Sequence, residues 1–206
     1  MIRVKDYRID FVRSFLAISN LEIPDKGVTL VTGDNGIGKT SFIRSILRIN
    51  TEYTGKIFIE EVENTRLKRK EISRLISYLP QIESSIFSIH VKDFIKQGLY
   101  AVKGSFFDEV IDALDLFYYL ERDYKYLSGG ERQLVKIARS IIPDVPYTIL
   151  DEPDTFLSKK NKEKVKGLIE YLSKKRGIII VSHAKNDFMK VGETLDFEDF
   201  LHREVE

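Results

Sequence analysis

A short glycine-rich run between two apolar segments constrains this chain more than any other feature. The run is Gly33-Asp34-Asn35-Gly36-Ile37-Gly38-Lys39-Thr40, which fits the pattern GxxxxGK[ST]. A loop that wraps polyphosphate must bring several backbone N–H groups close to oxygen atoms, and glycines leave the necessary space. The apolar segment 28–32 predicts a strand that feeds the loop, and the apolar spacing after Lys39 predicts a helix that follows it.

Two side chains at the end of the run indicate what the loop would hold. The helix that begins near Lys39 points its positive end at the loop, where it favours an anion. Lys39 would reach the β- and γ-phosphates of a nucleotide, and the Thr40 hydroxyl would bind Mg²⁺. The competing interpretation is a chance match in an ordinary turn. A strand before the loop and a helix after it make chance the weaker interpretation.

An acidic pair follows another segment of strand character. Tyr147-Thr148-Ile149-Leu150 leads into Asp151 and Glu152, and open α/β sheets bind ligands at the carboxyl ends of their strands. We expect Asp151 to hold Mg²⁺, directly or through water. Glu152 would polarise the attacking water, because phosphoryl transfer depends mainly on positioning and charge stabilisation. Alone, these acids would indicate a polar turn after a buried strand, and the glycine-rich loop makes that the minor interpretation.

A second motif, Leu127-Ser128-Gly129-Gly130-Glu131, lies downstream and precedes an apolar stripe at 134, 137, 138 and 141 that predicts a helix. Ser128 and Glu131 fit the S-x-x-E capping box, so the simplest interpretation is a well-capped helix. Two glycines behind the capping serine also leave bare N–H groups at the positive end of that helix, which makes a second anion site. One phosphate loop does not need two such sites in the same chain. The capping and anion-binding roles are compatible.

Composition excludes several classes of protein. The 206 residues suit a single domain, 1–206, and 43% of them are hydrophobic, as is ordinary for a soluble globular protein. The net charge of +1 argues against a nucleic-acid partner, since such domains usually carry a marked basic excess. Cysteine is absent, which excludes disulfides and thiolate metal sites. No apolar run approaches the roughly 20 residues that span a bilayer, and early charges argue against a secretory signal, so we expect a cytoplasmic protein.

Apolar runs of strand length alternate with helical patterns, which predicts an α/β fold with a mostly parallel sheet. The expected parallel strands are Val28–Thr32, Ile76–Leu79, Tyr147–Leu150 and Ile178–Val181. A meander over about 2–24, together with 57–59, predicts an antiparallel addition. Residues from about 88 to 140 show helical patterns and no good strand, so we expect a helical subdomain inserted in the α/β core.

The motifs, in this order, resemble the ATP-binding-cassette (ABC) ATPases over nearly the whole chain. The resemblance implies a RecA-like P-loop NTPase core, ATP and Mg²⁺ as cofactors, and a helical subdomain between the same two motifs. In the family, the motif that Ser128-Gly129-Gly130 resembles caps the γ-phosphate held by the opposite subunit. Two ATP molecules then lie at a head-to-tail dimer interface. Gln81 matches the glutamine that joins the Mg²⁺ site to the helical subdomain, and His183 matches the switch histidine that contacts the γ-phosphate. Taken singly, a glutamine or histidine at a strand end would be an ordinary structural residue.

Two positions depart from the family pattern. The family places an aspartate six residues after the catalytic glutamate, in a loop that crosses the dimer interface, and here Ser158 takes that position. We therefore expect unusual dimer contact and unusual coupling between the two sites. The aromatic residue that stacks on adenine in the family is less clearly placed. Phe11 is the first choice, with Tyr7 and Phe15 as alternatives.

The favoured interpretation is the nucleotide-binding subunit of an ABC transporter whose membrane-spanning subunits are separate polypeptides. It implies hydrolysis of ATP to ADP and phosphate, coupled to closure and opening of a homodimer or of a heterodimer with another ABC subunit. The protein would then be cytoplasmic and peripheral on the inner face of the cell membrane. Ile86, Phe87 and Ile89 fall where transporters border the groove for a membrane subunit's cytoplasmic helix. Equally, these residues could pack inside the helical subdomain.

Other classes fit less well, and one alternative stays open. Chromosome and repair ATPases of the family carry very long coiled-coil insertions, and ribosome-associated members usually hold two cassettes in one chain. A stand-alone soluble ABC ATPase of a cofactor- or complex-assembly system remains as the alternative. A P-loop kinase or GTPase would lack the second anion motif, and Asn161-Lys162-Glu163-Lys164 is only a near miss for the guanine-specifying NKxD. The transported substrate and the direction of transport stay open.

Overall fold

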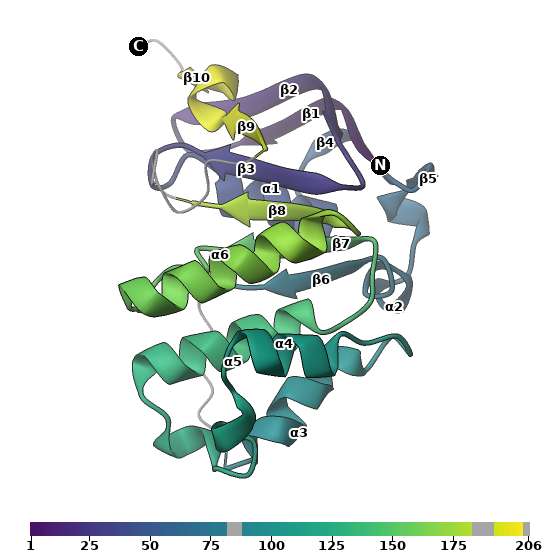
Figure 1. Cartoon of the computed structure of the whole chain (residues 1–206). Coiled ribbons are helices and arrows are strands. Elements are labelled where there is room, and N and C mark those ends of the chain that lie inside the picture. The colour runs from purple at the N-terminus through teal and green to yellow at the C-terminus, as the bar shows by residue number, and fades with distance from the viewer. Residues whose placement is uncertain (82–87, 183–191, 204–206) are drawn as a thin grey trace.

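The computed structural model describes residues 1–81, 88–182 and 192–203. Within these ranges the strands form one antiparallel and one parallel sheet (Figure 1). The antiparallel sheet has the order β10-β2-β1-β4-β5, with β1 Ile2–Asp10, β2 Ser14–Ile23, β4 Thr54–Ile59, β5 Val62–Glu63 and β10 Leu201–Arg203. The parallel sheet has the order β6-β7-β8-β3-β9, with β3 Gly27–Thr32, β6 Ile76–Leu79, β7 Tyr147–Asp151, β8 Gly177–Val181 and β9 Glu193–Asp196. The predicted α/β core with an antiparallel addition is therefore confirmed.

Helices lie between and around the two sheets. The α-helices are α1 Lys39–Ile46, α2 Arg69–Ile72, α3 Val91–Lys96, α4 Phe107–Ala113, α5 Gly129–Ile141 and α6 Lys159–Ser173. Short 3₁₀ helices are η1 Asn64–Arg66, η2 Gln97–Leu99, η3 Phe117–Tyr119, η4 Tyr124–Tyr126 and η5 Phe197–Phe200. Figure 1 shows α6 lying across the parallel sheet, with α3, α4 and α5 gathered beyond its β6 edge. None of the helices in the described part of the chain has the length and apolar character needed to cross a bilayer.

Two apolar cores cover the two faces of the parallel sheet, because successive strand residues point to opposite faces. In β8, Ile179 and Val181 belong to the core that contains α1 and the antiparallel sheet. Ile178 and Ile180 belong to the core that contains α5, α6 and the smaller helices. Phe42 of α1 is fully buried in the first core. Packing of α1 among both sheets therefore fixes the helix end that follows the glycine-rich loop.

The stretch between β6 and β7 is mainly helical where it is described, as its sequence pattern predicts. Its helices bury apolar side chains in one core, including Val91, Phe94, Val110, Leu134 and Ile137. Extended pairing among these described residues is limited to isolated bridges between His90 and Asp123 and between Ser105 and Pro143. We propose that this stretch, about 88–140, is a subdomain inserted in a single domain.

The order of the parallel strands determines which loops meet. β8 lies between β3, which feeds the glycine-rich loop, and β7, which ends at Asp151. The three strands run parallel, so their carboxyl ends open at one edge, where such sheets bind ligands. β9 and β10 were not among the predicted strands. β9 has a single buried residue, Leu195, and so lacks the apolar run that marks the other parallel strands.

Candidate active site

The glycine-rich loop joins β3 to α1 through backbone turns that ordinary residues resist. Gly33, Gly36 and Gly38 all have positive φ angles, and Gly38 is the N-cap residue of α1 at a φ of 111°. A side chain at Gly38 would also meet the ring of Phe11, whose Cζ atom lies 2.8 Å from the position of such a Cβ atom. The first turn of α1 reads Lys39-Thr40-Ser41, without an acid. The positive end of the helix therefore faces the loop without a neutralising carboxylate on its own first turn.

Lys39 is buried at the centre of this region. Its ammonium donates to the carbonyl oxygens of Gly33 at 2.6 Å and of Asp34 at 2.9 Å, which ties the helix end back onto the loop. Burial lowers the pKa of Lys39, and the carboxylates of Glu152 and Asp151 act against that shift. A cavity of about 250 Å³ opens here, lined by Asn35, Gly36, Gly38, Lys39, Thr40, Ser41, Gln81 and Glu152.

Asp151 ends β7 as a carboxylate that is only 1% exposed. Its Oδ2 atom accepts hydrogen bonds from Thr40 Oγ1 at 3.1 Å and from the Tyr78 hydroxyl at 3.4 Å. Its Oδ1 atom is buried with no hydrogen-bond partner in the described residues. Burial raises the pKa of Asp151, the Thr40 hydrogen bond lowers it, and the charge of Glu152 raises it again, for a net increase. A buried carboxylate oxygen without a partner is costly, and a cation would satisfy it.

Glu152 follows Asp151 in a strained backbone conformation. Its φ of 52° lies in the left-handed region, which few non-glycine residues adopt. Its N–H donates to the Val181 carbonyl at 2.9 Å, so the residue is held beside the end of β8. Gln81 Nε2 donates to Glu152 Oε1 at 2.7 Å. The structure thus brings together two predicted site residues that come from different strands and lie 71 residues apart.

Ser128 begins α5 with a complete capping box. Its hydroxyl accepts from the Glu131 N–H at 3.4 Å, and Glu131 Oε2 accepts from the Ser128 N–H at 2.7 Å. Gly129 is exposed, and a side chain there would meet no atom within 4 Å among the described residues. Ser128, Gly129 and Gly130 are not among the described residues that line the cavity beside Lys39. The structure therefore does not bring this helix end to the phosphate loop of the same chain.

The three aromatic candidates for adenine stacking lie in different surroundings. Phe11, in the turn after β1, is half-buried and lies against Gly38 of the loop. Tyr7 is 1% exposed in the core that contains α1, so it cannot meet a nucleotide. Phe15 stacks on His202 with ring centroids 4.8 Å apart. Phe11 is the candidate that we retain.

Ser158, where the family has aspartate, is the N-cap residue of α6. Its hydroxyl accepts from the Asn161 N–H at 3.3 Å. Serine and aspartate cap helices about equally well, so the helix start is kept while the negative charge is absent. The preceding loop is tied to α6 by Lys162, whose ammonium lies 2.9 Å from Asp154 Oδ2. Phe156 of that loop is 78% exposed at a φ of 64°.

Some predicted residues lie outside the described part of the chain. These are His183, Ile86 and Phe87. The N–H of Ser182, just before His183, donates to the Val31 carbonyl at 3.0 Å, so the chain leaves β8 beside the strand that feeds the loop. Ile89 is half-buried and packs on the helical core, as the packing alternative predicts for it.

Two further contacts involve residues that the sequence motifs did not single out. The Tyr78 hydroxyl donates to Asp151, and burial raises the pKa of Tyr78 to about 12, so it stays a neutral donor. Glu198 Oε1 accepts from the Asp34 N–H at 3.2 Å. Tyr78 lies on the strand that leads to Gln81, but no motif in the sequence pairs it with Asp151, 73 residues away. Glu198 lies 164 residues from Asp34, and no short motif contains it.

Curated proteins similar in sequence to this chain include ATP-binding proteins of import systems. Petrobactin import ATP-binding protein FpuD of Bacillus anthracis is 31% identical over 179 residues, which cover 81% of this chain and 66% of that protein. Iron(3+)-hydroxamate import ATP-binding protein FhuC of Bacillus subtilis is 27% identical over 179 residues, with the same coverage of both chains. This chain therefore spans just under two thirds of the length of these curated relatives.

Solved structures and a family model extend the comparison. A dimeric bacterial ABC transporter cassette superposes with a TM-score of 0.76 at 19% identity, covering 98% of each chain, which shows a shared fold. The family model described as ABC transporter matches residues 16–155, a span that contains the glycine-rich loop, the capped end of α5 and the acidic pair after β7. The chain belongs to the ATP-binding domains of the ABC transporter family.

Proposed function

We propose that this chain binds and hydrolyses ATP as the nucleotide-binding subunit of an ABC transporter. The observation that carries the proposal is the cavity where the positive end of α1, the buried Lys39 and the carboxylate of Glu152 meet. The phosphates of ATP would lie on backbone N–H groups within residues 33–40 other than that of Asp34, which donates to Glu198, and the adenine would lie against Phe11. Lys39 would then exchange its loop carbonyl partners in part for phosphate oxygens.

Mg²⁺ is the metal that the side chains of the site would suit. Magnesium prefers oxygen ligands and usually keeps water and substrate phosphate in its shell. Thr40, Gln81 and Asp151 offer such oxygens, and the buried Asp151 Oδ1 has no partner among the described residues. No group of three His, Cys, Asp or Glu side chains gathers in those residues, in keeping with an ion that takes other ligands from ATP and water. When bound, it would neutralise charge on the phosphate oxygens.

Glu152 would orient and polarise a water molecule beside the γ-phosphate. Gln81 Nε2 donates to one oxygen of its carboxylate at 2.7 Å, which orients that carboxylate. Lys39 would stabilise the charge that develops on the transferred phosphoryl group. His183 would contact the γ-phosphate, a role that rests on the family resemblance.

A second copy, or another ABC subunit, would complete the site. The capped end of α5 leaves Ser128 and Gly129 exposed, yet Ser128, Gly129 and Gly130 are not among the described residues that line the cavity of their own chain. A head-to-tail pair would place each such helix end on the γ-phosphate bound by the other chain. Two ATP molecules would then lie in the interface, and their hydrolysis would allow the two subunits to separate.

Membrane-spanning subunits would supply the transport path. The curated relatives are ATP-binding proteins of import systems for petrobactin and for iron(3+)-hydroxamate, so we propose import rather than export. No helix of the described residues could cross a bilayer. As an ATP-binding subunit of the proposed kind, the protein would act from the cytoplasmic face, through a contact with membrane subunits.

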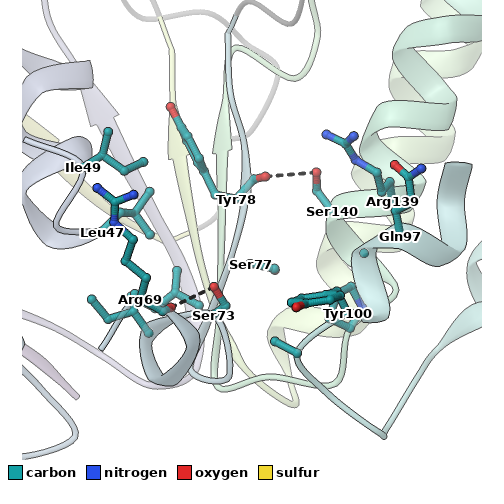
Figure 2. Close-up of a pocket in the computed structure, with 15 residues that line it drawn as sticks. Leu47, Ile49, Arg69, Ser73, Ser77, Tyr78, Gln97, Tyr100, Arg139 and Ser140 are labelled. Atoms are coloured by element: carbon teal, nitrogen blue, oxygen red, sulfur yellow. Dashed lines mark hydrogen bonds between the residues drawn. The ribbon is translucent and has the colours of Figure 1, made fainter. Parts of the chain in front are cut away.

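A groove between the α/β core and the helical stretch is the contact site that we propose (Figure 2). It has a volume of about 490 Å³. Figure 2 shows Arg69 and Ser73 on one side, Tyr100 and Gln97 on the other, and the strand of Tyr78 between them. That strand leads directly to Gln81, which contacts Glu152 at the proposed ATP site. A segment in the groove would therefore contact residues that lie only a few positions before Gln81 in the chain.

The charge of the groove suits an acidic partner segment. Arg69 and Arg139 line it over an apolar floor that includes Leu47, Ile72 and Ile76. A neighbouring hollow of about 570 Å³ shares Tyr100 and Ala101 with the groove and adds Lys70, Arg74, Lys103 and one acid, Asp144. Basic side chains beside an apolar floor fit a short amphipathic segment that carries carboxylates on one face.

Asp151→Asn is expected to stabilise the nucleotide-free protein. Burial holds the pKa of Asp151 above its unfolded value, so the ionised carboxylate costs stability at neutral pH, and this cost is relieved as the pH falls through the folded-state pKa. The variant should exceed the wild type by on the order of 1 kcal/mol at pH 7, and the gap should narrow toward about pH 4. Urea unfolding at several pH values measures this. Two results would contradict the assigned role of Asp151. One is a variant no more stable than the wild type at pH 7, and the other is a variant that Mg-ATP stabilises as much as it stabilises the wild type.

Glu152→Gln should lower steady-state ATP hydrolysis at least about 100-fold while leaving the ATP Kd within about threefold, because the phosphate cradle is untouched. Glu163→Gln, an exposed glutamate of α6, is the matched control and should hydrolyse ATP normally. Lys39→Ala should instead weaken ATP binding.

Sedimentation of Glu152→Gln should show a dimer with ATP and a monomer without it. A monomer in both conditions at full ATP affinity would rule out the sandwich.

Ser158→Asp should restore the interface charge without disturbing α6, since both residues cap helices well. We expect stronger ATP-driven dimerisation or altered cooperativity between the two sites, measured by sedimentation and by the ATP dependence of hydrolysis. Ser158→Asn is the control, because asparagine caps equally well but carries no charge. If neither variant differs from the wild type, the departure from the family is neutral.

Arg69→Glu should release the protein from membranes of its native host while the ATP Kd changes less than about twofold, because the groove would repel an acidic segment. Arg66→Glu, an exposed neighbour that does not line the groove, should stay bound. Retention of both variants on the membrane would refute docking in this groove. A wild-type protein that fractionates as soluble and cross-links to no membrane protein would favour the assembly-ATPase alternative.

A further inference from the structure

A segment near the C-terminus links both sheets beside the phosphate loop. This segment, Glu193–Arg203, is called the strap here, and it comprises β9, η5 and β10. β9 pairs in parallel with β3, and β10 pairs in antiparallel with β2 (Figure 1). Between them, Phe197 is fully buried, and its Cβ atom lies 3.2 Å from the position that a Cβ atom on Gly33 would take. The strap is therefore packed directly under the first residue of the loop.

Glu198 extends from the strap to the loop backbone. Its own N–H donates to Asp196 Oδ1 at 3.1 Å, which fixes the start of η5. Its Oε1 atom accepts from the Asp34 N–H at 3.2 Å. The carbonyl of that same peptide group belongs to Gly33, and it accepts from Lys39 Nζ at 2.6 Å. One peptide plane of the loop is thus held at its N–H end by a carboxylate and at its C=O end by an ammonium.

The two charges favour the same orientation of that peptide. A peptide group carries a dipole with its positive end at N–H and its negative end at C=O. A carboxylate at the first end and an ammonium at the second are both attracted, and hydrogen bonds to charged groups are the stronger ones. Burial lowers the pKa of Lys39, and the Glu198 carboxylate is among those that raise it again. Glu198 is not among the described residues that line the cavity, and its contact with the loop is the hydrogen bond from the Asp34 N–H.

We propose that Glu198 is a positioning residue, which holds the Gly33–Asp34 peptide so that Lys39 is aligned along the loop before nucleotide binds. This inference rests on the proposed ATP site. The hydrogen-bond acceptor of Glu198 is the main feature, and its charge adds only a small attraction, because the side chain is exposed to solvent and an exposed charge is screened. Loss of the acceptor would free the peptide to turn and would lower the fraction of loops ready to bind phosphate.

The test compares three substitutions at Glu198 with one beside it. Glu198→Ala removes the acceptor, Glu198→Gln keeps an acceptor without the charge, and Glu198→Asp keeps the charge but withdraws it by one methylene. Asp199→Asn changes the adjacent exposed carboxylate and serves as the control. Equilibrium binding of ATP and of ADP, the KM and kcat of hydrolysis, and thermal unfolding are measured for each.

We expect the Ala and Asp variants to bind both nucleotides about three- to tenfold more weakly, the effect of one hydrogen bond. Their KM should rise while kcat changes less than about twofold, and the Gln and Asp199→Asn variants should stay within about twofold of the wild type. If the Ala variant does not fold, the comparison of Gln with Asp decides. Tighter binding by Ala, or equal effects of Ala and Gln, would overturn the inference while ATP binding by the wild type stands. A wild type that binds neither nucleotide would overturn the ATP site and this inference together.

Discussion

The burial of two opposite charges, Lys39 and Asp151, is the cost that the rest of this structure must offset. Moving either charge out of water costs several kcal/mol, and the hydrogen bonds to the loop carbonyls and to Thr40 offset only part of that cost. The pKa of each group is accordingly shifted toward its neutral form. Apolar cores on both faces of the parallel sheet stabilise the fold against this cost. A polyphosphate with its cation would give both charges the partners they lack.

The loop owes its shape to constraint from several directions at once. β3 enters it from the parallel sheet, α1 leaves it in the core shared with the antiparallel sheet, and the strap packs against its first residue. Phe11 lies against Gly38 at its other end. Such a loop needs little reordering when an anion arrives, because its glycines already have the positive φ angles of the turn. Preorganisation of this kind lowers the entropic cost of binding.

The features of the site that depend on neighbouring residues could be predicted from the sequence. The glycine spacing of the loop and the S-x-x-E pattern at Ser128 each encode their own local geometry. The contacts of Tyr78 with Asp151 and of Glu198 with Asp34 could not be predicted, because they join segments 73 and 164 residues apart. Strand β9 was not predicted from the sequence for a related reason. β9 pairs with β3, far away in the sequence, and only one of its own residues is buried.

The length and placement of α5 have a mechanical consequence. The helix has 13 residues and is therefore roughly 20 Å long. Its first turn follows Ser128, and its last turn carries Arg139 and Ser140, which form one wall of the groove. The Ser140 hydroxyl donates to the Tyr78 carbonyl at 3.3 Å, so that wall is fastened to β6. Because α5 is buried along one side, a tilt of its first turn onto a phosphate, in the head-to-tail pairing proposed above, would also move the groove at its far end.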